Sequence, residues 1–457
     1  MGWNIPYAFN ETDSAISDSQ LKMYLDMYEE IPFGVLNMLT SLINYGGRVT
    51  DDKDIRTVDI ILRSYYRPEI LDEGFKLSTS GTYISPPVDD EHPLSSYNEY
   101  IDNLPIVPAP EVFSMHKNAD ITCAENDTYN MLGTIRSLQP RSSGGAGMSQ
   151  SDQILAIAKK IEDHLPAPDE GYMEGDATKL LYPITYNESM NTVLVQEQEK
   201  FNRLLRAMKT TLKGVQLAVQ GLQVMSTDLE DVANSFYANL VPGVWESVAY
   251  VSLKPLSAWV DELWDRVKMM TDWVEFGTPK VMWISGFFFP QAFLTGVRQN
   301  FARKYQLPID QIEYDFLMKD NFKDDGSDVE AKPEDGCYIW GLQLEGARFC
   351  TETHVLADSH PRELYSALPI MHLNPVQSRP YTMEKIYRCP VYKTLTRAGL
   401  LSTTGHSTNF VFWVELPSAE PTIFRDSLVS ETNQAVKLAD SEKWAKAGVA
   451  LFCQLRF

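Results

Sequence analysis

The sequence has few cations, few cysteines and no long apolar segment. Lys and Arg total 40 against 62 Asp and Glu, so the 457-residue chain has a formal net charge of −22. A surface with this charge repels phosphate groups, and we therefore expect neither nucleic acid nor a membrane as a partner. The five cysteines are odd in number and lack CxxC spacing, which favours reduced thiols in a cytosolic setting over a disulfide framework. The first ten residues have no signal-peptide pattern, and we expect the chain to begin within a domain.

The sequence also lacks the common motifs of nucleotide binding and hydrolysis. No Lys follows a Gly, so a GxxxxGK[ST] phosphate-binding loop is excluded. The Gly-rich segment 140–151 fails the GxGxxG pattern because Gln150 stands at its last position, and we interpret it as a linker. GxSxG and HExxH motifs are missing as well. We predict no catalytic residue and no bound cofactor in this chain.

One segment concentrates residue types that can bind metals. Its two imidazoles and three carboxylates belong to Glu352, His354, Asp358, His360 and Glu363. Pro361 and the uneven spacing fit no single helix face, so we predict a surface loop without a metal, and a metal site is the alternative. The acidic segment 320–335 lacks EF-hand spacing and is expected to be a solvated loop. Cys389 precedes a proline in an expected strand, which indicates a packed thiol rather than a nucleophile.

The N-terminal region predicts a small helical subdomain. Apolar spacing indicates three short helices within residues 14–66, with Thr50 as the N-cap of the third. Arg48 stands where a helical lid could offer a cation to a neighbouring nucleotide site, but a salt bridge to Asp51 or Asp52 is the favoured interpretation. The proline-rich segment 78–118 is expected to be extended.

A long amphipathic helix is predicted from Ser189. Its apolar residues keep to one stripe over roughly 50 Å, so that stripe must be covered. We predict antiparallel packing against a helix at 257–276, with Gly214 and Gly221 allowing close approach. The residues expected to be buried within the chain are Leu204, Leu205, Met208 and Leu212.

Two further patterns belong to this helical region. Thr227 and Glu230 form a capping-box signature for a shorter helix. The tryptophans of the helix at 257–276 are interpreted as helix-packing residues rather than a ligand cage. They are Trp259, Trp264 and Trp273.

Beyond residue 280 the sequence indicates β-structure. The segment WISGFFFPQAFLTG (283–296) is interrupted and too short to span a membrane, and it predicts a buried strand followed by a helix near Pro290. Five later apolar segments are separated by turn residues, which is typical of an antiparallel barrel or sandwich. The predicted fold class is therefore α+β, with a helical subdomain, a helical region with one long helix and a C-terminal antiparallel β-barrel.

Several segments resemble the C-terminal part of dynein heavy chains. They occur in order from Gly2 to Phe457 and include GWNIPYAFNETD, INYGGRVTDDKD, NADITCAENDT, PRSSGGAGMSQ, ESMNTVLVQE, WISGFFFPQAFLTGVRQNFARKY, LADSHPRELYSALPIMHLNPV and GVALFCQLRF. YRCPVYKT and LSTTGHSTNFV are similar to axonemal rather than cytoplasmic members, of a single-headed inner-arm type. The connection at 417–444 looks longer than is usual in that family.

The resemblance implies three units. Residues 1–110 would hold the helical lid of the sixth AAA+ module and a Pro-rich connection, 111–280 the helical part of the C-terminal domain, and 281–457 its β-barrel part. The resemblance to the axonemal members implies a parent protein that is an ATP-driven microtubule motor of cilia and flagella. The ATP-binding modules and microtubule-binding stalk would lie elsewhere in the parent protein.

The implied role is therefore a non-catalytic structural and regulatory segment that packs on the AAA+ ring. ATP and Mg would be bound by the parent motor, which also binds microtubules and dynein light and intermediate chains in the cytoplasm, cytoskeleton and axoneme. The charge of −22 makes microtubule binding by this chain alone unexpected, because the tubulin surface is also acidic. The alternative function is that of a free-standing cytosolic scaffold or adaptor protein.

Overall fold

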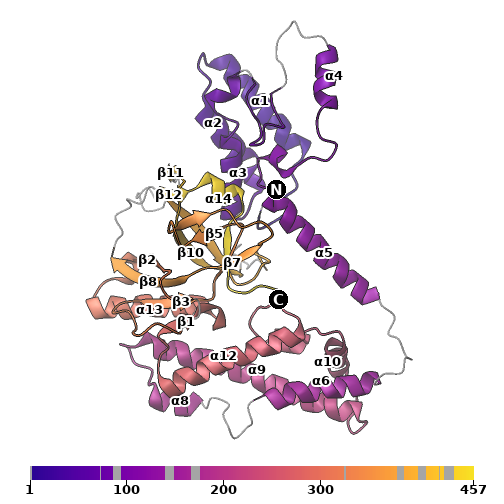
Figure 1. Cartoon of the computed structure of the whole chain (residues 1–457), viewed down its shortest axis with the longest axis vertical. Helices are drawn as coiled ribbons and strands as arrows, with labels where there is room; N and C mark the ends of the chain where they lie inside the picture. Colours follow the sequence, from indigo (N-terminus) through magenta and orange to yellow (C-terminus); the bar gives the residue numbers. More distant parts are fainter. Residues whose placement is uncertain are drawn as a thin grey trace.

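The computed structural model of the protein has three parts (Figure 1). A helical N-terminal part lies at one end, a bundle of long helices lies at the other, and two main β-sheets lie between them. The structure describes residues 3–72, 74–85, 94–138, 149–165, 175–323, 326–377, 385–399, 408–420, 423–426 and 437–456. Most of the predicted linker 140–151 lies outside these residues, as do residues 421–422 and 427–436 of the long connection 417–444.

The N-terminal part contains three main helices, as predicted. They are α1 (Glu11–Met27), α2 (Phe33–Met38) and α3 (Asp52–Arg63), and a π-helical turn (Leu39–Asn44) continues α2. The N-cap of α3 is Asp51, so the prediction of Thr50 is wrong by one residue. The Asp51 carboxylate accepts hydrogen bonds from the backbone N–H groups of Lys53 and Asp54, at 2.9 and 3.4 Å.

The proline-rich segment 78–118 is less extended than expected. Its described residues include helix α4 (Leu94–Asp102) and a 3-10 turn (Pro110–Phe113). Pro110 stands at the start of that turn, where a backbone N–H group would have no acceptor within the turn, so its absence in proline costs no hydrogen bond. Prolines therefore begin structure here as well as interrupt it.

The bundle is built around the predicted long helix. Its helices are α6 (Gln150–His164), α8 (Gly175–Leu181), α9 (Ser189–Val219), α10 (Thr227–Tyr237), α11 (Gly243–Glu246) and α12 (Leu256–Phe276). Helix α9 begins at the predicted residue and is 31 residues long. The four residues predicted to be buried, Leu204, Leu205, Met208 and Leu212, are at most 2% exposed.

Helices α9 and α12 are antiparallel, as predicted. The Tyr182 hydroxyl, just before α9, donates to the carbonyl of Trp273 near the end of α12 (2.9 Å). At the other end Trp245 donates from Nε1 to Thr211 in the second half of α9 (2.7 Å) and stacks on Trp259 near the start of α12. The α9 surface is shared, however, because α6, α10 and α13 (Pro290–Tyr305) also pack on it.

Three details of the helical region differ from the predictions. Gly214 approaches Leu229 of α10 rather than α12, and Gly221 has φ +76°, so it ends the helix in the left-handed conformation that glycine adopts without strain. The N-cap of α10 is Ser226, whose hydroxyl accepts from the N–H of Leu229, so the predicted capping box is wrong by one residue. Trp264 is 42% exposed, unlike the other two tryptophans of α12, and does not fill the core.

The described strands form two main sheets and two two-stranded ribbons, and the predicted antiparallel barrel is not confirmed. One sheet has the order β1-β3-β8-β2 and the other β10-β9-β13-β4-β7; β5 pairs with β6, and β11 with β12. The pairs β1–β3 and β13–β9 are parallel, which a purely antiparallel pattern does not allow. The strands are β1 (Val281–Trp283), β2 (Ile312–Lys319), β3 (Cys337–Trp340), β4 (Gln343–Glu345), β5 (Arg348–Cys350), β6 (Val355–Ala357), β7 (Tyr365–Ala367), β8 (Ile370–Gln377), β9 (Ile386–Tyr392), β10 (Phe410–Pro417), β11 (Ile423–Asp426), β12 (Lys437–Asp440) and β13 (Ala450–Phe452).

The aromatic segment 283–296 joins the bundle to the sheets. Its expected strand is short, because β1 ends at Trp283 and a 3-10 turn (Ile284–Gly286) follows. Helix α13 begins at Pro290, as predicted. Glu197 of α9 is buried, and its carboxylate accepts the backbone N–H groups of Phe288 (2.6 Å) and Phe289 (3.1 Å), which have no strand partner there. Within the described part of the sequence, none of the helices is apolar over a length that could cross a bilayer.

The burial of α9 gives a direct stability test. Replacing Leu205 by Ala removes buried methyl groups between α9 and its neighbours, and we expect the free energy of unfolding to fall by about 2–5 kcal/mol. Leu222→Ala is the matched control, because this leucine is 72% exposed, and it should change that free energy by less than about 0.5 kcal/mol. Chemical denaturation of both variants measures the difference, and equal effects would show that the α9 stripe is not core.

Candidate functional site at the junction of helix α3 and the C-terminal sheet

A buried carboxylate holds the N-terminal residues against helix α3. Asp54 is fully buried, and its two oxygens accept the backbone N–H groups of Asn4 and Ile5, each at 3.0 Å. The Asn4 side chain also bonds to Asp51 (3.0 Å) and accepts the hydroxyl of Tyr392 on β9 (2.7 Å). Burial raises the pKa of Asp54 to about 6, although the hydrogen bonds from Asn4 and Ile5 lower it.

An arginine carries the contact from α3 into the five-stranded sheet. Arg56 donates to the backbone carbonyl of Arg388 (2.9 Å) and to the hydroxyl of Tyr387 (3.2 Å), both on β9. The Tyr387 hydroxyl in turn donates to the carbonyl of Val449, just before β13 (2.7 Å). A continuous path of hydrogen bonds therefore joins α3 to the two central strands of this sheet. Figure 1 shows α3 beside the short helix α14 (Glu442–Lys446), which packs on it.

A second arginine, Arg397, contacts strand β4, the residues before β13 and Trp3. Arg397 is buried, and its guanidinium donates to the Glu345 carboxylate and to the carbonyl of Gly448, each at 2.8 Å. The same guanidinium lies 5.1 Å from the ring centre of Trp3. Trp3 covers Gly448 so closely that a Cβ there would lie 2.4 Å from the ring, which explains why a glycine stands at this position. We call these contacts, made by Trp3–Ile5, Asp54 and Arg56 with β9 and its neighbours, the α3 junction.

The residues singled out from the sequence lie elsewhere. Arg48 pairs with Asp13, its Nε lying 2.8 Å from a carboxylate oxygen, so the predicted pairing with Asp51 or Asp52 is wrong. Asp51 instead caps α3, and Asp52 pairs with Lys53 at 2.5 Å. Asp13 lies on α1, 35 residues away in the sequence, and local spacing could not reveal it.

The candidate metal ligands are not brought together. Among the residues that the structure describes, no group of three His, Cys, Asp or Glu side chains could hold a metal ion. His354 instead lies 2.5 Å from Asp320, and Asp358 lies 3.1 Å from Lys443. Cys389 is a fully buried residue of β9, and burial raises the pKa of its thiol far above the ordinary range, so the predicted packed thiol is confirmed.

The α3 junction predicts a pH dependence. The pKa of Asp54 is about 6 in the folded chain, against about 3.9 when unfolded, so the folded state keeps this proton to higher pH. Protonation of Asp54 therefore adds to the free energy of unfolding. The added stability is fully present below pH 4 and is lost as the pH rises through 6. Relative to Asp54→Asn, the natural protein should therefore lose up to about 3 kcal/mol of unfolding free energy over that window.

The control for this measurement is Asp52→Asn, whose carboxylate is 69% exposed. Its unfolding free energy should stay at a constant difference from that of the natural protein between pH 4 and pH 7. Denaturant titrations across this range provide the measurement. If the difference in unfolding free energy between the natural protein and Asp54→Asn also stays constant over this pH range, the two backbone N–H groups keep Asp54 ionised.

Comparison with known proteins agrees with this architecture. The family model of the AAA lid domain of dynein heavy chains matches residues 1–119, and the family model of their C-terminal domain matches residues 125–453. The sequence is 45% identical to "Dynein axonemal heavy chain 1" of Rattus norvegicus and 43% identical to "Dynein axonemal heavy chain 3" of Homo sapiens, over 100% of its own length and 10% of theirs. Its identity to "Dynein axonemal heavy chain 12" of Homo sapiens is 40%, over 100% of this sequence and 14% of that protein. The protein therefore belongs to the dynein heavy chain family, of which it spans the AAA lid and C-terminal domains.

Proposed function

We propose that this protein is a non-catalytic structural and regulatory segment of an axonemal dynein heavy chain. The parent protein would be an ATP-driven microtubule motor of cilia and flagella, of the single-headed inner-arm type. ATP and Mg would be bound by its other modules, and the parent would also bind microtubules and dynein light and intermediate chains. The names of the relatives support the axonemal assignment, and membership of the family leaves the scaffold or adaptor alternative without support.

The observation that carries this proposal is the α3 junction. A lid that only flanked the C-terminal domain would need no hydrogen bonds from its helices to the strands. Here Arg56 crosses from the lid to β9, and Asp54 holds the preceding backbone in place. Separating the two parts would remove the partners of Arg56 on β9 and break the hydrogen bond between Tyr392 and Asn4, and polar groups that stay buried without a partner are unfavourable. The lid and the sheet would therefore move as one body when the ring changes shape.

The surface that meets the ring would include helix α5 (Asn118–Leu138). Figure 1 shows α5 running along one side of the molecule, from the N-terminal part towards the bundle. Large apolar side chains along it are 40–63% exposed, namely Ile121, Tyr129, Met131, Leu132 and Ile135. Clusters of this kind mark interaction surfaces, which fits the proposed packing on neighbouring AAA+ modules of the same heavy chain.

We also propose the division into units that the resemblance implies, with residues 1–110 as the lid and its connection, 111–280 as the helical part and 281–457 as the β-rich part.

The coupling role is tested in the complete heavy chain. Arg56→Ala removes the contacts to Arg388 and Tyr387 and leaves buried acceptors unpaired, which should cost about 1–3 kcal/mol in the stability of this segment. We expect microtubules to glide more slowly over the variant, while its affinity for ATP stays unchanged. Arg67→Ala is the control, since Arg67 is 48% exposed and lies outside the α3 junction. Gliding at the natural speed by a destabilised Arg56→Ala motor would contradict the proposal.

The absence of catalysis is tested on the 457-residue protein alone. Because the sequence has no phosphate-binding loop and Arg48 is already engaged by Asp13, we expect no ATP hydrolysis and no tight binding of Mg-ATP. Phosphate release and isothermal titration provide the measurements, with the complete heavy chain as the positive control. Stoichiometric, tight ATP binding by the purified protein would show that a nucleotide site has been missed.

A further inference from the structure

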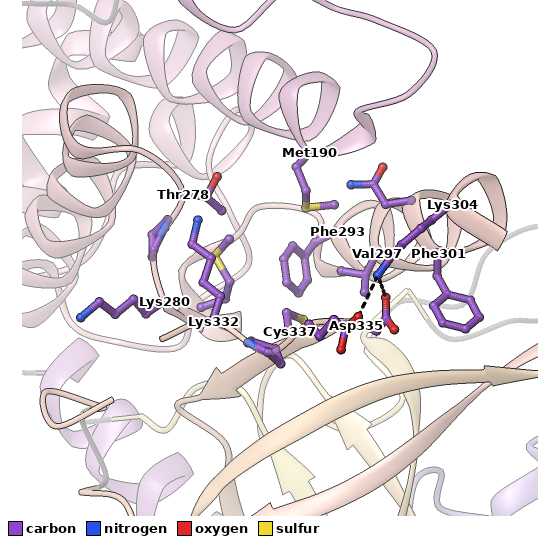
Figure 2. A pocket seen from close by; sticks show the side chains of 16 residues that line it. Met190, Thr278, Lys280, Phe293, Val297, Phe301, Lys304, Lys332, Asp335 and Cys337 are labelled. Atoms are coloured by element: carbon purple, nitrogen blue, oxygen red, sulfur yellow. Dashed lines mark hydrogen bonds and ion pairs between the residues drawn. The ribbon is translucent and has the colours of Figure 1, made fainter. Parts of the chain in front are cut away.

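A cavity lies between helix α13, the start of α9 and the loop that leads into β3. Its volume is about 200 Å³. Figure 2 shows Met190 of α9 on one side, Phe293 and Val297 of α13 in the middle and Cys337 of β3 opposite. Burial raises the pKa of the Cys337 thiol far above its usual range, so it remains an uncharged part of the apolar wall.

The wall of the cavity is fixed by close backbone packing. Gly336, next to Cys337, has φ +73°, and a Cβ there would lie 1.9 Å from the carbonyl oxygen of Leu373 on β8. Gly296 of α13 is likewise packed against Met190, where a Cβ would lie 2.4 Å from the methionine methyl. Only glycine fits at position 336, so the β3 side of the cavity is held in place before any ligand binds, whereas the Met190 methyl beside Gly296 is the end of a flexible side chain.

The rim of the cavity carries three lysines against two carboxylates, those of Glu334 and Asp335, and both carboxylates lie beside Lys304. Lys304 is held by Asp335, with 2.6 Å between Nζ and the carboxylate oxygen. Lys280 donates to the backbone carbonyl of Val329 (3.1 Å) and pairs with no carboxylate among the described residues. Lys332 is exposed and likewise forms no ion pair within the described part of the sequence. Two ammonium groups are therefore available to an anion at the mouth of an apolar cavity.

We propose that this cavity is a docking site for an acidic segment of a partner protein, with one aromatic side chain as its anchor. A void of about 150 Å³ already accepts benzene, so the observed volume suits one phenyl or indole ring. Nucleotides and most cofactors occupy pockets of about 300–1,000 Å³ and would not fit. Lys280 and Lys332 would then pair with carboxylates on either side of the ring.

The charge of the protein also selects the kind of partner. A second copy of it would bring another net charge of −22 and meet long-range repulsion. A short acidic segment is instead attracted by Lys280 and Lys332 at the rim. Its aromatic side chain is transferred from water into the cavity, which adds to the binding free energy. The site is separate from the α3 junction, so the proposal does not depend on the coupling function.

The test uses the complete 457-residue protein and a fluorescein-labelled peptide with one phenylalanine between two pairs of glutamates. Fluorescence polarisation should show saturable binding with a Kd of about 10–100 µM. Lys332→Glu should weaken it about tenfold, because an attractive charge becomes a repulsive one. Lys268→Glu makes the same charge change at an exposed site on α12 and should alter the Kd less than about twofold.

Two further probes separate the anchor from the charge. The same peptide with serine in place of phenylalanine should bind at least about tenfold more weakly, since no ring fills the cavity. Free 3-phenylpropionate should compete only at millimolar concentration, because it carries one carboxylate. Equal binding of the serine peptide, equal effects of Lys332→Glu and Lys268→Glu, or competition by 3-phenylpropionate as strong as the peptide's own binding would each overturn the proposal.

Discussion

A buried carboxylate at each end of the molecule accepts two consecutive backbone N–H groups and so fixes a segment that contacts the middle sheets. Glu197 of α9 accepts those of Phe288 and Phe289, and Asp54 of α3 accepts those of Asn4 and Ile5. In each case the backbone leaves regular structure inside the protein, and its N–H groups would otherwise be buried without partners. Burial raises the pKa of both carboxyls, so each link is made against the cost of removing a charge from water.

These links make the middle sheets depend on both ends of the molecule. Glu197 belongs to the bundle, and its loss would free the segment that turns from β1 into α13. The α3 junction does the corresponding work at the other end, where Arg56 meets β9. Among the described strands, the edge strands β1, β2, β10 and β7 of the two main sheets have a strand neighbour on one side only. The proposed coupling role rests on this arrangement of lid, sheet and bundle.

Local features were predictable from the sequence, and long-range ones were not. The start of α9 and the burial of Leu205 follow from a repeat of apolar residues along one helix, which needs no knowledge of the partner. Helix caps were wrong by one residue, because Asp51 and Ser226 compete with equally suitable neighbours. Contacts such as Arg56 with Arg388 join residues 332 positions apart, and no spacing pattern encodes them. Parallel strand pairs were missed for the same reason, since alternating apolar segments look alike in either direction.

The position of β13 has a consequence for the order of folding. This strand follows all the others in the sequence, yet it lies between β9 and β4 at the centre of the five-stranded sheet. Until residues 450–452 have been synthesised, the pairs β10–β9 and β4–β7 are separate ribbons, each with an open edge. Open edges can pair with other proteins, and contacts this distant in sequence form slowly. Completion of the sheet therefore waits until the last described strand inserts between β9 and β4, and the nascent protein is exposed to aggregation until that happens.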